Sequence, residues 1–357
     1  MGSIGIPGVP LMGTADRRSL LKRAAALGLA VPAAAGLGGT DVRAQDTGGH
    51  DHNATPVPGG IPQGGTGEAT PIPGEISPFQ RYDPYLKPAE AGPHDIVIEA
   101  RDQTLYVAKD VAYAAWTFDG TVPGRVFRVT EGDTVNFTLK NSAQMAHSMD
   151  FHSAKTPPNV NYKTIPPGQE FSFTFPATTA GAFMYHCGTP PVLMHIGAGM
   201  YGTMIVDPKE GWSPAQELVF VQSEYYLIDS GDGSGVKLPD FKKMMTLNFM
   251  DYVVFNGHAS QYVDEPIDVK VGELIRIFVM NAGPNVWSSF HVVGAIFDKA
   301  YINANPHNEL RGLQSITIGP GDGACVEFTV EEPGHYVAVN HAFGHATHGA
   351  VAVLNAT

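Results

Sequence analysis

The sequence predicts an all-β protein made of two tandem Greek-key β-sandwich domains, and three observations predict this fold. Gly and Pro are abundant (41 and 28 residues) and only 16% of the 357 residues are charged, as in proteins with many turns. Short β-branched or aromatic stretches recur from about residue 94, and none reads as a long amphipathic helix. The same motifs then occur twice, which indicates a duplicated domain.

The duplication is visible in matched turn motifs. Phe118-Asp119-Gly120 is echoed by Phe255-Asn256-Gly257, and Pro167-Gly168 is echoed by Pro320-Gly321. Further matches are Glu131-Gly132-Asp133 with Val271-Gly272-Glu273, Ala180-Gly181-Ala182-Phe183 with Pro333-Gly334-His335-Tyr336, and Gly202 with Gly349. These matches predict a first domain over residues 91–210 and a second over residues 211–357.

The N-terminal region reads as a targeting segment followed by a linker. Arg17-Arg18 precedes a moderately apolar run from Ala24 to Leu37, a pattern that resembles a twin-arginine export signal. We therefore expect residues 1–44 to be a signal peptide and the mature protein to be periplasmic or extracytoplasmic, with no membrane span. The Gly- and Pro-rich residues 45–90 are expected to form a flexible linker or arm.

Composition narrows the range of partners. The formal net charge of −13 argues against nucleic acid as a partner and leaves no basic patch for a membrane surface. The two cysteines, Cys187 and Cys325, do not form a disulfide framework. Cys325 lies in a strand-like stretch without metal-binding neighbours, and we expect it to be a core residue.

One group of side chains in the first copy has the composition of a blue-type copper site. Cys187, His195 and Met200 follow one another on a loop after a strand, and His147 lies upstream. A thiolate, two imidazoles and a weak axial thioether suit both oxidation states of copper. Singly, each of these residues would more often be structural, but together at these spacings they predict copper.

A second metal site follows from strand parity. Neighbouring strand residues point to opposite faces, so His186 faces outward if Cys187 faces inward. His147 and His152 point oppositely if their strand is regular, and Asp150 shares the parity of His152. Two outward, exposed histidines beside a carboxylate are an incomplete site that zinc or copper could occupy.

The second copy offers candidates for the missing ligand. Asn340 stands where the first copy has Cys187, so a second blue-type site is excluded. The adjacent His341 is a candidate third ligand, and His291 occupies the strand that matches the one carrying the upstream ligands. From spacing alone, His291 could equally be a structural histidine.

Taken together, these residues resemble the copper-containing nitrite reductase family, two-domain cupredoxin-like proteins, over the whole chain from about residue 94. The run from Cys187 to His195 is compact and resembles the branch with a short type 1 loop. There, Met194 stands where many members carry Trp. The motifs that carry the resemblance are His147-Ser148-Met149-Asp150-Phe151-His152, Tyr185-His186-Cys187 with His195 and Met200, Ser289-Phe290-His291-Val292-Val293, and Val339-Asn340-His341.

The resemblance implies two copper ions per subunit and a role for each site residue. The implied type 1 ligands are His147, Cys187, His195 and Met200, and the implied type 2 ligands are His152, His186 and His341. Nitrite would be reduced by one electron to nitric oxide and water at the type 2 copper. Asp150 and His291 would supply protons, and Val293 would shape the nitrite pocket.

The resemblance also implies the electron path and the partners. An electron would enter at the type 1 copper and pass through the Cys187-His186 peptide to the type 2 copper. The donor would be a small cupredoxin or a c-type cytochrome. The subunits would form a homotrimer whose type 2 sites lie between neighbours, with His291 and His341 contributed by the adjacent subunit.

Two other classes of protein remain as alternatives. A laccase-like multicopper oxidase needs several His-x-His pairs and a Cys flanked by histidines, whereas Gly188 follows Cys187 and the only His-x-His is His50-Asp51-His52. A non-catalytic electron carrier would use the type 1 site alone and would leave the outward histidines unexplained. Copper content separates the three: two ions per chain for a reductase, one for a carrier and four for an oxidase.

Overall fold

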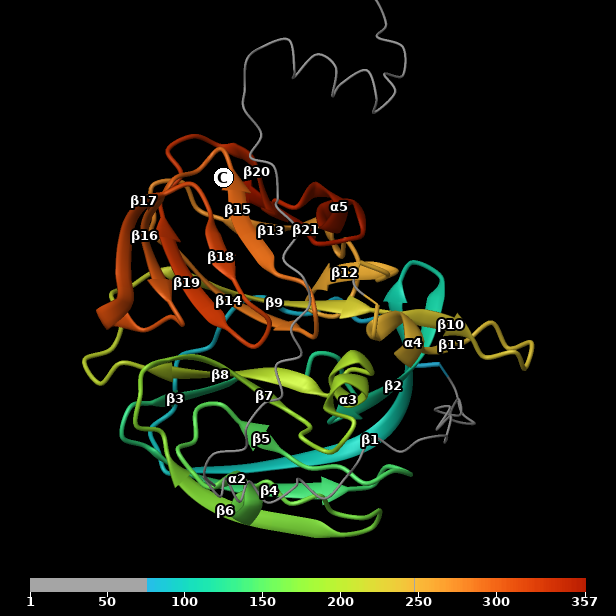
Figure 1. Ribbon diagram of the computed structural model, residues 1–357. Coiled ribbons are helices and arrows are strands. Elements are labelled where there is room, and N and C mark those ends of the chain that lie inside the picture. The colour runs from blue at the N-terminus through green and yellow to red at the C-terminus, as the bar shows by residue number, and fades with distance from the viewer. Residues whose placement is uncertain (1–75, 247) are drawn as a thin grey trace, which may run out of the picture. The chain divides into compact units, whose positions relative to one another are not determined.

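The structure is a computed structural model that describes residues 76–246 and 248–357 (Figure 1). The predicted signal peptide, the predicted arm up to residue 75, and the His50-Asp51-His52 motif lie outside the described residues. The all-β prediction is confirmed, because the described helices are short: α2 (Pro158–Asn161), α3 (Val192–Gly197), α4 (Phe241–Met244), α5 (Phe343–Thr347) and the 3₁₀ turn η1 (Pro306–Asn308). None of the helices in this part of the chain has the length and apolarity needed to span a bilayer.

The first sandwich consists of a six-stranded and a four-stranded sheet. The larger sheet has the order β10-β11-β2-β1-β4-β6 and the smaller one the order β3-β8-β7-β5. The bounds of its strands are β1 (His94–Ala108), β2 (Val111–Phe118), β3 (Phe127–Thr130), β4 (Thr134–Asn141), β5 (Asp150–Phe151), β6 (Glu170–Pro176), β7 (Gly181–His186), β8 (Tyr201–Asp207), β10 (Leu227–Asp229) and β11 (Lys237–Pro239). The β10–β11 hairpin comes from beyond residue 210, so the predicted domain boundary does not fully separate the sheets.

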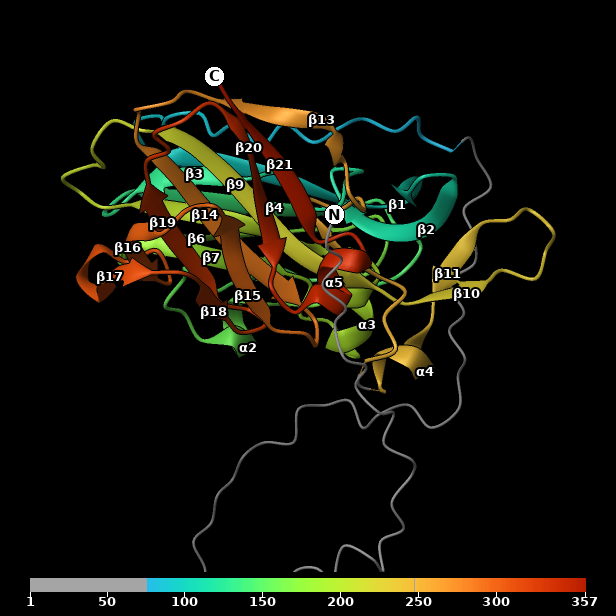
Figure 2. The same ribbon diagram turned by 90° about the horizontal axis from the view of Figure 1, so that it is seen from above.

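The second sandwich consists of a six-stranded and a five-stranded sheet, with the orders β12-β9-β14-β19-β16-β17 and β13-β21-β20-β15-β18. Figure 2 shows β13, β21 and β20 side by side, as their pairing requires. The bounds are β9 (Gln216–Tyr225), β12 (Tyr252–Phe255), β13 (Tyr262–Val269), β14 (Ile275–Gly283), β15 (Ser288–Val293), β16 (Phe297–Ile302), β17 (Glu309–Leu313), β18 (Ile316–Ile318), β19 (Gly323–Phe328), β20 (Gly334–Asn340) and β21 (Val351–Ala356).

The duplication is confirmed by turns of the same conformation. Asp119 and Asn256 both adopt the left-handed region (φ 58° and 54°), and each is followed by a glycine with φ near 81°. The prediction that Gly202 matches Gly349 is wrong by three residues. Gly349 has a φ of 120°, and its counterpart is Gly199, with a φ of 121°. The sequence contains several glycines in this region, so spacing alone selected the wrong one.

Strand β7 carries two different faces into two different cores. Tyr185 and the following Cys187 belong to a large apolar cluster that includes the interior of the first sandwich. Ala182 and Met184, which point the opposite way, belong to a cluster shared with β9, β14 and β19 of the second sandwich. The outward face of β7 is therefore covered by the second domain rather than by solvent.

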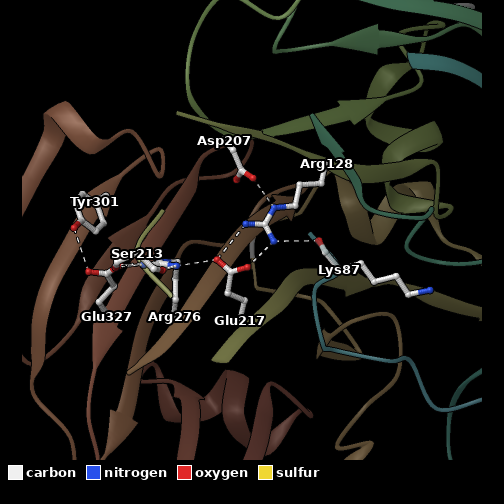
Figure 3. Close-up of polar contacts among 8 residues, drawn as sticks. All are labelled: Lys87, Arg128, Asp207, Ser213, Glu217, Arg276, Tyr301 and Glu327. Carbon is white, nitrogen blue, oxygen red and sulfur yellow. Dashed lines mark hydrogen bonds and ion pairs between the residues drawn. The ribbon is translucent and has the colours of Figure 1, made fainter. Parts of the chain in front are cut away.

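A buried ion network joins the two sandwiches (Figure 3). Arg128 of β3 donates to Asp207 at 2.8 Å and to Glu217 of β9 at 2.6 Å. Arg276 of β14, whose side chain is 1% exposed, donates to Glu217 at 2.8 Å and pairs with Glu327 of β19. Burial by itself would raise the pKa of Glu217, but the two guanidinium groups hold that pKa below its ordinary value. The network fixes how β3 and β9 meet.

Residues 76–90 do not behave as the flexible arm predicted up to residue 90. Tyr82 N–H donates to Gln261 Oε1 at 2.9 Å, and Tyr85 Oη donates to the Asp268 carbonyl at 2.9 Å. Leu86 N–H donates to the Glu217 carbonyl at 3.0 Å. Residues 82–86 therefore lie along the second sandwich, held by contacts with residues more than a hundred positions away.

Candidate metal centres

The first cluster brings together three of the residues predicted to bind type 1 copper. His147 lies just before β5, Cys187 just after β7, and His195 in α3. The Nδ1 atoms of His147 and His195 are 3.2 Å apart, and the Cys187 Sγ lies 3.3 Å from His195 Nδ1 and 3.8 Å from His147 Nδ1. All three side chains are buried, at no more than 1% exposed.

Helix α3 and the turn after it position His195 and Met200. The helix begins after Pro191, and Gly199, with its φ of 121°, reverses the chain toward β8. A Cβ at position 199 would lie 2.7 Å from Val122 and 2.9 Å from a backbone oxygen, so only glycine fits. Met200 is fully buried in the same apolar cluster as Cys187, and the Cys187 N–H donates to the Met200 carbonyl at 3.1 Å.

Burial keeps the imidazoles of this cluster neutral. Burial, followed by the neighbouring His195 ring, lowers the pKa of His147 to about 3, and burial lowers the pKa of His195 to about 4. Neutral imidazole is the form that binds metals. The indole of Trp116 on β2 lies 4.8 Å from the His195 ring, centre to centre, and shields it. Sequence analysis did not single out Trp116, because it lies far upstream of the loop in sequence.

The sulfur of Cys187 has hydrogen-bond donors around it. The Ser148 N–H lies 3.4 Å from Sγ and the Ser148 Oγ 3.9 Å from it. Burial raises the pKa of the Cys187 thiol, and the backbone N–H groups of Ser148 and Thr189 oppose that rise. A cation among these ligands would favour the thiolate, as thiolate-metal sites require.

The spacing of these atoms fits a metal ion. Ligand bonds of about 2.0 Å to nitrogen and 2.3 Å to sulfur, arranged in a plane, place the ligand atoms about 3.5 to 3.7 Å apart. The observed separations of 3.2, 3.3 and 3.8 Å bracket that range. His147 Nε2 is buried without a hydrogen-bond partner among the described residues, so its ring is held by packing and by whatever Nδ1 binds.

The second cluster lies on the other face of the same strands. Asp150 of β5 is paired directly with His186 of β7, so their side chains share one face. The Nε2 atoms of His152 and His186 are 3.1 Å apart, and Asp150 Oδ2 lies 3.8 Å from His186 Nε2. Strand parity thus led to the correct grouping of these residues into a possible metal site.

The His186 ring is oriented by a hydrogen bond at the nitrogen that faces away from His152. His186 Nδ1 donates to the Cys187 carbonyl at 2.9 Å, which leaves the Nε2 lone pair facing His152. The His152 ring lies against Gly321 of the second sandwich. Desolvation, followed by the His186 ring, lowers the pKa of His152, while Asp150 acts in the opposite direction. Two imidazole nitrogens 3.1 Å apart beside the Asp150 carboxylate can bind one cation together, so this site also fits a metal ion.

One detail of the parity prediction is wrong. Both histidines were expected to be exposed, but only His152 is, and His186 is 8% exposed. The reason is that the outward face of β7 packs against the second sandwich, which a strand pattern cannot reveal.

The remaining predicted residues lie together in the second sandwich, apart from this cluster. The rings of His291 and His341 are 5.4 Å apart, and the His341 N–H donates to the Ser289 carbonyl at 2.7 Å. His291 Nδ1 donates to the Gln314 carbonyl, which leaves its Nε2 free. Val293 is 46% exposed nearby on β15. Within the described residues, neither histidine belongs to the group formed by Asp150, His152 and His186.

Several known proteins are similar to this chain in both sequence and fold. A copper-containing nitrite reductase from Cereibacter sphaeroides is 30% identical over 284 residues, with 73% of this chain and 75% of that protein aligned. The solved copper nitrite reductase of Nitrosomonas europaea is 39% identical, with a TM-score of 0.69 over 74% of this chain and 93% of that one. The chain belongs to the copper-containing nitrite reductase family. These relatives contain copper, and the two clusters of this chain offer side chains that could hold a metal ion.

Other matches place this membership in context. A copper-containing nitrite reductase from Neisseria meningitidis is 40% identical over 257 residues, and the match spans 70% of this chain but only 65% of that relative's length. A multicopper oxidase family model matches residues 99–211. A solved multicopper oxidase is 27% identical, with a TM-score of 0.64 over 74% of this chain and 88% of that one. The fold is therefore shared with multicopper oxidases. The fold alone does not specify the reaction, which has to be inferred from the residues of the site.

Proposed function

We propose that this copper nitrite reductase family member reduces nitrite to nitric oxide and water: nitrite, two protons and one electron give one nitric oxide and one water. The observation that carries the proposal is the placement of His186 and Cys187. These consecutive residues belong to two different clusters, each of which fits a metal ion. An electron received at one cluster therefore needs to cross only one peptide unit to reach the other.

The ligand assignment follows from the two clusters. His147, Cys187, His195 and Met200 would hold type 1 copper, and His152, His186 and His341 would hold type 2 copper. When bound, the first copper would accept the electron, and the second would bind nitrite as a Lewis acid and reduce it. The protein's contribution is to hold His147 and His195 neutral by burial and to turn the His186 Nε2 toward the second cluster.

Asp150 and His291 are the proposed proton donors. The Asp150 side chain is 29% exposed and its Oδ2 lies 3.8 Å from a proposed ligand nitrogen, so it lies where an oxygen of bound nitrite would be protonated. His291 has one ring nitrogen fixed by a carbonyl and the other free to carry the second proton. Val293 would form an apolar wall beside them.

A homotrimer would complete the second cluster. His291 and His341 lie within a surface that exposes Trp287 (61%), Ile296 (65%) and Phe343 (59%), and the Phe343 ring packs edge-on against His341 with 4.7 Å between ring centres. Exposed apolar groups of this size mark interaction surfaces. If this surface meets the Asp150–His152–His186 cluster of a neighbouring subunit, His341 becomes the missing third imidazole.

We further propose a periplasmic location, reached through the twin-arginine signal of residues 1–44, and an electron donor that is a small cupredoxin or a c-type cytochrome. The support for export is the Arg17-Arg18 pair ahead of the apolar run. The support for a protein donor is that the type 1 ligands are buried, so electrons must arrive by contact at the surface next to α3.

Copper content and product identity test the function. We expect two copper ions per chain and nitric oxide from nitrite in the presence of a reduced dye, detected with a nitric oxide electrode. One copper per chain without turnover would indicate an electron carrier. Four copper ions with dioxygen consumption would indicate an oxidase and would reject the proposal.

Mixed assemblies test the shared site. His152→Ala and His341→Ala should each abolish turnover, because each removes a type 2 ligand. When the two variant chains are unfolded, mixed and reassembled at random, about one quarter of the sites should combine an intact half from each chain. Recovery of about that share of the activity would support the proposal. No recovery, with reassembled wild-type chains recovering fully, would mean that one chain provides the whole site.

A further inference from the structure

Three hydroxyl groups form a chain that runs from the Cys187 sulfur toward the surface. Thr164 Oγ1 and Thr189 Oγ1 are 3.1 Å apart, and Thr189 Oγ1 donates to Ser148 Oγ at 3.1 Å. Ser148 Oγ lies 3.9 Å from Cys187 Sγ. Ser148 is fully buried, Thr189 is 7% exposed and Thr164 is exposed. We call these three residues the hydroxyl chain.

Counting donors and acceptors fixes the direction of the chain. A hydroxyl has one proton to donate and two lone pairs to accept with. Ser148 Oγ accepts from the Gly188 N–H at 3.0 Å and from Thr189 Oγ1 at 3.1 Å, which occupies both lone pairs. Its own proton is therefore left for Sγ. The Thr189 proton goes to Ser148, so Thr189 Oγ1 accepts from Thr164.

From this geometry we infer that the hydroxyl chain tunes the reduction potential of the type 1 centre through Ser148. The inference rests on the proposed assignment of Cys187 as a type 1 ligand. A donor aimed at the sulfur withdraws electron density from it, and the oxidised copper–thiolate bond depends on that density more than the reduced one does. The hydroxyl chain therefore favours the reduced form of the type 1 centre. Each hydroxyl group in it also polarises the next one, which strengthens the hydrogen bond to the sulfur. Thr189 and Thr164 are positioning residues that act through Ser148.

Reduction potentials of variants test this inference in the copper-loaded protein. Ser148→Ala should shift the reduction equilibrium constant of the type 1 centre about fivefold toward the oxidised form, the value of about one hydrogen bond, or about 40 mV at 59 mV per tenfold. Thr189→Val should cause a smaller shift in the same direction and Thr164→Val a smaller one still. The copper–sulfur stretching frequency in the resonance Raman spectrum should rise most in Ser148→Ala, less in Thr189→Val and least in Thr164→Val. If these residues only supported the fold, no such graded rise would be expected.

The matched control is Thr138→Val in β4. It removes a hydroxyl group that hydrogen-bonds with the Ser172 hydroxyl of β6 at 2.8 Å, in the six-stranded sheet of the same sandwich. It should leave the potential and the Raman spectrum unchanged. A double variant sharpens the test: Thr189→Val should add no shift in the Ser148→Ala background, because its effect passes through Ser148.

Three results would overturn the inference: potentials of Thr189→Val and Thr164→Val equal to that of the control, a higher potential in Ser148→Ala, or a full Thr189→Val shift in the Ser148→Ala background. The two threonine variants decide the matter even if Ser148→Ala does not fold. If the wild-type protein loaded with copper lacks the intense visible band of a copper thiolate, the assignment of Cys187 as a ligand is wrong. A normal band together with unchanged potentials in the variants would reject the role of the hydroxyl chain and leave the ligand assignment intact.

Discussion

The loop after β7 in the first sandwich and the loop after β20 in the second have the same backbone hydrogen bonds but different side chains. The Cys187 N–H donates to the Met200 carbonyl at 3.1 Å, and the Asn340 N–H donates to the Ala350 carbonyl at 3.2 Å. The next contact also repeats, from Met200 to His195 and from Ala350 to His345, both at 3.1 Å. Asn340, His345 and Ala350 therefore stand where the first sandwich has Cys187, His195 and Met200.

Asn340 closes its loop with hydrogen bonds alone. Its Oδ1 accepts from the Ser289 N–H at 3.1 Å, just as the Cys187 Sγ faces the Ser148 N–H at 3.4 Å. Its Nδ2 donates to Gln222 Oε1 at 3.0 Å and lies 3.0 Å from His345 Nδ1. The second loop is thus closed by one buried amide at the position where the first loop has a proposed metal ligand.

The outward faces of the two sandwiches differ in the same way. Asp150 is paired with His186 in the first sandwich, and His291 is paired with Val339 in the second. Asp150 and His291, the two proposed proton donors, therefore occupy equivalent positions of the duplicated fold. Opposite this position the first sandwich has the proposed ligand His186, whereas the second has the apolar Val339.

The largest effect is expected for Cys187→Ala, which should abolish the intense visible band and electron delivery while leaving type 2 copper bound. The thiolate is the source of that band, and the second cluster does not use it. Absorption and electron paramagnetic resonance spectra measure both. Asn340→Ala, at the equivalent position, is the control and should keep the band. A retained band in Cys187→Ala would contradict the assignment.

Next in size is the loss of turnover in Asp150→Asn and His291→Asn. Each should reduce the turnover number about 10²- to 10⁴-fold with both coppers bound, the usual span for a lost general acid. Steady-state nitric oxide production with metal analysis measures this effect. Full activity in either variant would remove that residue from the mechanism.

A moderate loss of stability is expected for Asn340→Ala. The change removes the partner of several buried polar groups, and we expect a decrease of about 3 kcal/mol in the free energy of unfolding. Chemical denaturation of the metal-free protein measures it. If stability does not change, the amide does not close the second loop.

The smallest effect is expected for His345→Ala. It should cost about 1 kcal/mol of stability, because one hydrogen bond is lost, and it should leave copper content and colour intact. His195→Ala, at the equivalent position, should lose the type 1 colour. Loss of copper from His345→Ala would show that the second loop also binds metal and would break the comparison.

The sequence went far in predicting the fold and the clusters because both depend on local rules. The period of a strand placed His186 and Cys187 on opposite faces, and the repeated turns identified the duplication. The residue types of the first cluster already specified a soft thiolate site. The match of Gly202 with Gly349 failed because a spacing of a few residues cannot distinguish one loop glycine from another.

Contacts between residues that are remote in sequence could not be predicted from the sequence. Trp116 shields His195, and Thr164 and Thr189 reach the Cys187 sulfur through Ser148, but no local pattern connects them. The β10–β11 hairpin adds to a sheet of the other sandwich across the predicted boundary. Such contacts arise from packing between distant segments, and no local pattern in either segment indicates its partner.

By itself, the sequence determined which side chains could bind metal and on which face of its strand each lies, because residue type and strand period are local properties. The tertiary structure decided that the outward face of β7 is covered, so His186 is buried rather than exposed. It also decided that Asn340 closes the second loop with hydrogen bonds and that hydroxyl groups reach the Cys187 sulfur. These features depend on how two sandwiches pack, and packing is settled only when distant surfaces meet.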